Sequence, residues 1–75
     1  MLTKQLSEKL QGKLVDVTVL LSKTRADKRE NAASFAEVIR DLEKRQRVIS
    51  EALKNNRDDE LVAAFGDHYA LQLGV

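Results

Sequence analysis

The sequence predicts an all-α fold: an antiparallel helical hairpin plus a short third helix, self-associating into a helical bundle. The 75 residues include no proline and only three glycines, so long helices are permitted. Two segments carry apolar residues at intervals of three and four, which is the helical period. The chain is expected to form one domain, 1–75, with helices at about 3–28, 35–55 and 58–66 and an apolar tail at 67–75.

Small size makes association part of this prediction. A chain of this length buries only about 60% of the surface that its unfolded form exposes, and such folds usually gain stability from disulfides, metals or association. The sequence has no cysteine and one histidine. Association, or unusually good helix packing, is therefore the remaining source of stability.

The first helix is predicted from a stripe of apolar residues, but part of it has a second interpretation. Residues 14–21 are rich in valine, with Val15, Val17 and Val19 at period two, which is typical of a strand. Such a strand would need a second copy of the chain as its partner. We prefer the helix, because the stripe of 4–3 spacing is unbroken and comprises Leu2, Leu6, Leu10, Leu14, Val17 and Leu21.

The second helix has the clearest heptad pattern. Ser34, followed three residues later by Glu37, predicts a capping box at its start, and Asn55 and Asn56 suit its end. Gln46 is the one polar residue at these heptad positions. It could be buried and set the register of association, or it could lie at the edge of the contact with its amide in water; we favour the buried alternative. We call these positions the seam and predict that they mediate partner binding or self-association: Phe35, Ile39, Leu42, Gln46, Ile49 and Leu53.

The C-terminal part is predicted less fully. The acidic run Asp58-Asp59-Glu60 suits the positive start of a third helix, and Gly66 is expected to end it. The tail that follows has apolar residues at alternate positions, yet Phe65, Tyr69 and Leu73 would share one face of a helix. Both conformations of the tail remain open at this point.

Catalysis and metal binding find little support in the residue types. The only histidine, His68, has no nucleophile placed beside it, and the three glycines are too isolated to form a phosphate-binding loop. One histidine without cysteine does not make a zinc site, and the acidic run lacks the ligand spacing of a calcium loop. We therefore expect no enzymatic activity, no metal and no cofactor.

Uneven charge raises the alternative of nucleic-acid binding. Net charge is +1 over residues 1–22, +3 over 23–47 and −3 over 48–75. Asp41 with Arg45, and Glu43 with Arg47, have the i,i+4 spacing of helix-stabilising ion pairs, and the pI of about 8.1 is modest for a nucleic-acid-binding protein. The residues that would contact phosphates are Lys23, Arg25, Lys28, Arg29, Arg40, Lys44 and Arg47.

These patterns predict a small non-enzymatic protein–protein interaction module, such as an adaptor, an inhibitor or a chaperone-like subunit, acting through helix packing. A dimeric nucleic-acid-binding regulator is the alternative. Val15, Val19 and Val48 are expected to be only partly covered by the hairpin, which favours a dimer or another protein as partner. No apolar run approaches the length needed to cross a bilayer, and a chain without cysteine fits the reducing cytoplasm.

Overall fold

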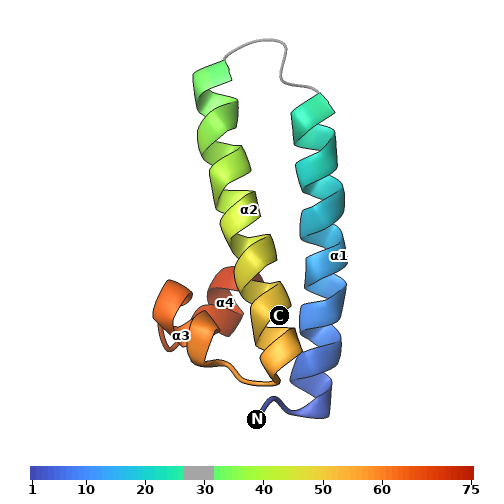
Figure 1. Cartoon of the computed structure of the whole chain (residues 1–75), viewed down its shortest axis with the longest axis vertical. Coiled ribbons are helices and arrows are strands. Elements are labelled where there is room, and N and C mark those ends of the chain that lie inside the picture. The colour runs from blue at the N-terminus through green and yellow to red at the C-terminus, as the bar shows by residue number, and fades with distance from the viewer. Residues whose placement is uncertain (27–31) are drawn as a thin grey trace.

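The computed structural model describes residues 1–26 and 32–75, and the side chains of residues 1–26 and 35–75. Its helices are α1 (Lys4–Ala26), α2 (Ala32–Asn55), α3 (Asp59–Phe65) and α4 (Tyr69–Leu73). Figure 1 shows α1 and α2 side by side as an antiparallel hairpin, with α3 and α4 beside the C-terminal half of α2. The described residues contain no strand, so the all-α prediction is confirmed and the strand alternative for residues 14–21 is wrong.

Helix α1 turns its leucine stripe toward α2. Leu10, Val17 and Leu21 are buried on this face. At the start of the helix, the Leu6 N–H donates to Thr3 Oγ1 at 3.1 Å, so that Thr3 satisfies one of the free donors of the first turn. The helix is described as far as Ala26, and the predicted extension through residues 27 and 28 lies outside the described residues.

The start of α2 differs from the prediction and its end agrees with it. The helix begins at Ala32, two residues before the predicted cap Ser34, so the predicted start is too late. Alanine has the highest helix propensity, which favours extension of the helix through Ala32 and Ala33. At the other end, Asn56 adopts φ 54°, its N–H donates to the Leu53 carbonyl at 3.3 Å, and the Arg57 N–H donates to the Ala52 carbonyl at 3.1 Å. This pair of bonds is a Schellman motif.

The core consists of two clusters along the hairpin. The smaller one, toward the end where α1 leads into α2, contains Val17, Leu21 and Leu42, with Ile39 packed against it. The larger one joins the other half of the hairpin to α3 and α4, and its buried members are Leu2, Leu10, Val48, Ile49, Ala52, Leu61, Tyr69 and Leu73. The expectation that Val48 is only partly covered is therefore wrong: its side chain is 8% exposed, because it packs in the cluster to which α3 and α4 contribute.

The tail contains a short helix, α4, over residues 69–73. Gly66 ends α3 with φ 86° and ψ −179°, a conformation that essentially only glycine adopts, and α4 follows after two more residues. Tyr69 and Leu73 of α4 are buried, whereas Leu71 is 82% exposed. The period of α4 is therefore that of a helix, and its buried face closes the larger cluster.

Candidate interaction surfaces

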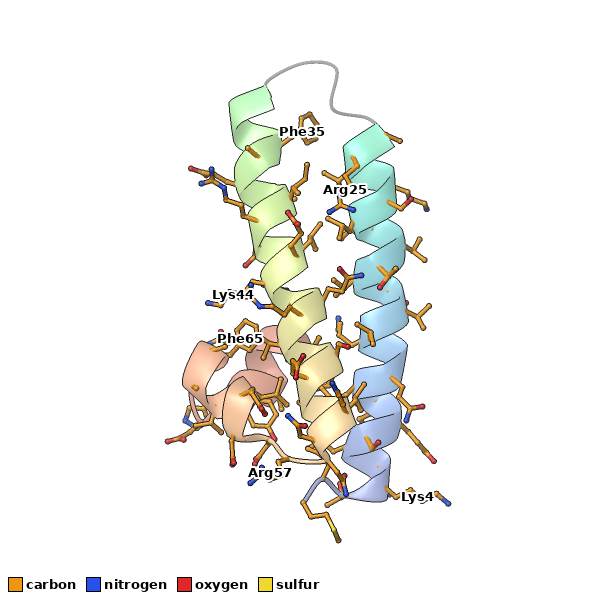
Figure 2. All side chains as sticks on the ribbon, in the orientation of Figure 1. Lys4, Arg25, Phe35, Lys44, Arg57 and Phe65 are labelled. Atoms are coloured by element: carbon orange, nitrogen blue, oxygen red, sulfur yellow. The ribbon has the colours of Figure 1, made fainter. Side chains whose placement is uncertain are left out.

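The seam is used inside the chain. Leu42 and Ile49 are buried among residues of the chain's own core, and Ile39 and Leu53 are half-buried against the same two clusters. Phe35 is half-buried and lies between the upper ends of α1 and α2 (Figure 2). In the single chain, four of the six seam residues therefore already pack in the chain's own core: Ile39, Leu42, Ile49 and Leu53.

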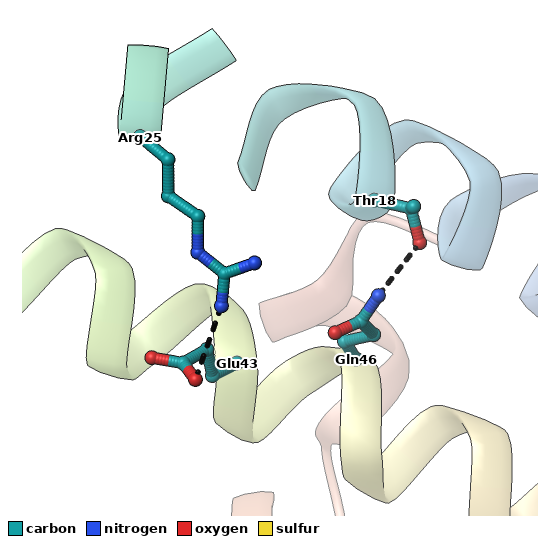
Figure 3. A network of polar contacts seen from close by, with 4 residues as sticks. All are labelled: Thr18, Arg25, Glu43 and Gln46. Carbon is teal, nitrogen blue, oxygen red and sulfur yellow. Dashed lines mark hydrogen bonds and ion pairs between the residues drawn. The ribbon is translucent and has the colours of Figure 1, made fainter. Parts of the chain in front are cut away.

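Polar contacts join α1 and α2 along one edge of the seam (Figure 3). Gln46 is half-buried, and its amide nitrogen donates to Thr18 Oγ1 at 3.1 Å. Farther along, Arg25 Nη2 lies 3.3 Å from Glu43 Oε2, with both side chains about half exposed. Gln46 thus lies at the edge of the helix contact and bonds across it, an arrangement between the two alternatives drawn from the sequence.

The predicted basic residues are divided between internal contacts and solvent. Arg25 is paired with Glu43, and the Lys44 ammonium lies 3.5 Å from the Ala64 carbonyl and 5.4 Å from the centre of the Phe65 ring. Figure 2 shows Lys44 and Phe65 next to each other on the side of α2 that carries α3. Lys44 therefore helps to hold α3 against α2.

The remaining basic residues are exposed or lie outside the described residues. Lys23, Arg40 and Arg47 are exposed, whereas Lys28 and Arg29 lie outside the described residues. Arg40 and Arg47 are seven residues apart and so share the outer face of α2.

The two ion pairs predicted within α2 have different outcomes. Asp41 and Arg45 pair as predicted, with their atoms 3.1 Å apart. Glu43 pairs with Arg25 of α1 instead of Arg47. Because α1 supplies a competing cation, the helix spacing alone did not decide the partner of Glu43.

The opposite face of α1 carries exposed apolar residues. Val15 is 61% exposed and Val19 is 47% exposed, as expected for both. They belong to a set of exposed positions that recur at intervals of four and three on the side of α1 away from α2. We call this set the outer stripe: Glu8, Gly12, Val15, Val19, Ser22 and Ala26.

The sequence alone does not predict that the outer stripe forms one surface. Its 4–3 spacing is visible there, but only Val15 and Val19 are large and apolar, and the leucine stripe on the inner face is far stronger. Leu20, 51% exposed, lies to one side of the outer stripe. The structure identifies the outer stripe because it shows which face of α1 the hairpin leaves uncovered.

Other kinds of site are not seen in the described part of the chain. Residues 1–26 and 32–75 form no pocket, and they contain no group of three or more His, Cys, Asp or Glu side chains placed to hold a metal ion. His68 is exposed. Among the described residues, no helix has both the length and the apolar character needed to span a membrane.

Comparisons with known proteins return nothing for this chain: no family model, curated protein or solved structure matches it. What the chain does must therefore be inferred from its own surfaces.

Proposed function

We propose that this chain is a non-enzymatic protein–protein interaction module, an adaptor, inhibitor or chaperone-like subunit, that binds by packing the outer stripe of α1 against a partner. The observation that supports it most is the exposure of Val15 and Val19 on one helix face. Covering both side chains would contribute roughly 2 kcal/mol at the usual value of apolar burial. A cysteine-free chain suits the reducing cytoplasm, where we propose that the module acts.

The proposed binding surface is the outer stripe and not the seam, because the seam is largely buried in the single chain. Aspartate at Leu42 or Ile49 would place a charge in the core of the single chain, where it has no partner. Such variants would lose the fold, and any loss of binding would then say nothing about the surface. Variants of the outer stripe avoid this problem, because its side chains are exposed.

The second candidate function is nucleic-acid binding through the outer face of α2. The observation that favours it is the exposure of Arg40 and Arg47 on one face of that helix, which a dimer would duplicate. The internal contacts of Arg25 and Lys44 count against it, since they occupy two of the predicted phosphate-binding side chains.

Affinity capture from the native cell extract separates the two functions. The wild-type chain is compared with the double variant Val15→Ser/Val19→Ser and with the double variant Arg40→Ala/Arg47→Ala, each with and without nuclease. Serine and valine have similar helix propensities, so the first variant keeps α1. Circular dichroism checks that every bait is folded.

We expect nuclease-resistant protein partners that are lost with Val15→Ser/Val19→Ser and retained with Arg40→Ala/Arg47→Ala. Partners that disappear after nuclease treatment and depend on Arg40 and Arg47 would instead support the nucleic-acid candidate. If the outer-stripe variant captures the same proteins as the wild type, the proposed function is wrong.

A further inference from the structure

We propose that the partner of the outer stripe is α1 of a second copy of this chain, bound antiparallel so that Gly12 of each copy lies opposite Val15 of the other. This inference rests on the proposed function, since it names the partner of the same surface. It accounts for two features of α1: the spacing of the outer stripe and the position of Gly12 within it.

The spacing of the outer stripe is that of a helix–helix contact. Intervals of 4, 3, 4, 3 and 4 from Glu8 to Ala26 place its members at the two core positions of successive heptads. All six positions are exposed in the single chain. The α1 helix therefore has a second face with the heptad period of a coiled-coil contact, opposite the face that packs on α2.

Neither the backbone conformation nor the packing of the single chain requires a glycine at position 12. It lies in the interior of α1 without a positive φ, and a Cβ atom built on it meets nothing within 4 Å. Glycine in a helix interior costs about 1 kcal/mol relative to alanine. Opposite Val15 of a second copy, the missing side chain leaves room for the two helices to approach closely.

Charges beside the outer stripe select the register. With Gly12 opposite Val15, Lys9 of each copy flanks the contact next to Asp16 of the other, and two-fold symmetry makes this pair twice. Both side chains are exposed, and neither forms an ion pair with a described residue of its own chain. On the other flank, Gln11 comes next to Thr18 of the second copy, which adds no repulsion.

The competing arrangements bring like charges together or shorten the contact. The proposed register sets Glu8 opposite Val19 of the second copy. Moving it by one heptad toward the C-terminus apposes the two Asp16 side chains and sets Lys9 against Lys23, and moving it by one heptad toward the N-terminus apposes the two Lys9 side chains. Parallel helices would place the two Glu8 side chains together in the contact. A shift of two heptads leaves only residues 15–26 in contact, compared with 4–23 in the proposed register. Among these arrangements, only the proposed register combines a long helix–helix contact with oppositely charged residues next to each other.

A like-charged approach occurs at each end of the proposed contact. Lys4 comes opposite Arg25 of the second copy, and Glu43 of that copy already pairs with its own Arg25. Because this approach lies at the periphery and in water, its repulsion is small and screened by salt.

The dimer should be weak. Two helices in contact over residues 4–23 run together for about 30 Å with a width of about 10 Å, which is well below the roughly 800 Å² per partner of a standard interface. The whole described surface is 5372 Å², so the contact involves a small part of it. Association should therefore be visible only at high concentration and low salt.

Sedimentation equilibrium of charge-reversal variants tests the proposal up to about 1 mM, where weak contacts of this size are measurable. Lys9→Glu and Asp16→Lys each turn both attractive pairs into repulsive ones, so each should raise the dissociation constant roughly tenfold at low salt. The double variant Lys9→Glu/Asp16→Lys restores both attractions and should bring the constant back to within about twofold of the wild type.

Matched controls are available on α2. Lys54→Glu and Glu51→Lys make the same changes of net charge at exposed positions outside the contact, and they should leave dimerisation unchanged. Circular dichroism confirms that each variant remains helical. If a single reversal lowers the helix content, the comparison of the double variant with the wild type still tests the pairing.

Each other result contradicts the proposal in a distinct way. Tighter association of Lys9→Glu would indicate the register that sets Lys9 against Lys23, and equal association of all variants would show that α1 is not the contact. A monomer at every concentration would overturn self-association altogether. In that case, a nuclease-resistant partner lost with Val15→Ser/Val19→Ser would leave the proposed function standing.

Discussion

At the scale of single residues, Tyr69 links the C-terminal helix to the chain that precedes α3. Its hydroxyl donates to Asp58 Oδ2 at 3.1 Å, and the ring is buried in the larger core cluster. Asp58 precedes α3, but its side chain makes no hydrogen bond to the start of that helix. The sequence predicts an acidic start for α3. It cannot show that the Asp58 carboxylate accepts a hydrogen bond from Tyr69 instead, because Tyr69 lies eleven residues farther along the chain.

The Tyr69–Asp58 contact predicts a pH-dependent stability. Burial, and then the hydrogen bond and negative charge of Asp58, raise the pKa of Tyr69 above its ordinary value. The folded chain therefore holds this proton more firmly than the unfolded chain. The contribution is fully present below about pH 10, the ordinary pKa of tyrosine, and is lost as pH rises through the higher folded value.

We expect Tyr69→Phe to lower the free energy of unfolding by about 0.5–1.5 kcal/mol at pH 7, since one hydrogen bond is lost. The difference between wild type and variant should shrink as pH rises above about 10. Urea unfolding of both proteins across this range measures it. A difference that stays constant with pH would show that the tyrosine proton is not linked to folding.

At the scale of helices, the sequence predicts long periodic segments well and their surroundings poorly. The leucine stripe and the seam place α1 and α2 correctly, and Asn56 marks the end of α2. The capping pattern at Ser34 predicts a late start for α2, whereas the helix propensity of the two alanines before it favours the observed earlier start. For α4, residues 69–73 are too few for period two and period 3.6 to be told apart.

The exposed surface of α1 could also be predicted only in part from the sequence. Exposure of Val15 and Val19 was predictable, because the leucine stripe fixes which face of α1 points inward. The burial of Val48 was not, since it depends on where α3 and α4 pack. Nor could the sequence show that α1 packs against the seam of α2 and leaves its own outer stripe uncovered.

Helix α1 also provides a test of the role of Gly12. We expect Gly12→Ala to raise the free energy of unfolding of the single chain by about 1 kcal/mol, because the site is exposed and has space for a methyl group. Chemical denaturation at micromolar concentration, where the chain is monomeric in our account, measures this. As a contrast, Gly66→Ala should be destabilising, since φ 86° strains any L-residue.

A destabilised Gly12→Ala monomer would mean that Gly12 has a structural role within the chain. The inference that this glycine is kept for contact with a second helix would then lose its support.

At the scale of the whole molecule, α3 and α4 cover only part of the hairpin. They lie beside the C-terminal half of α2, where they close the larger core cluster (Figure 1). The long outer side of α1 lies away from them, and it carries Val15 and Val19 in exposed positions. The fold thus uses the inner faces of its helices for its own stability and leaves the outer side of α1 uncovered.

The most direct test of this central claim is a dilution series followed by ¹⁵N–¹H correlation spectra of the wild-type chain, from about 1 mM down to low micromolar concentration. We predict that the amide shifts that change with concentration map to the proposed α1 contact, from Lys4 to Lys23, while those of Leu42 and Ile49 stay constant. Changes confined to the Arg40–Arg47 face of α2, or to the seam, would contradict it.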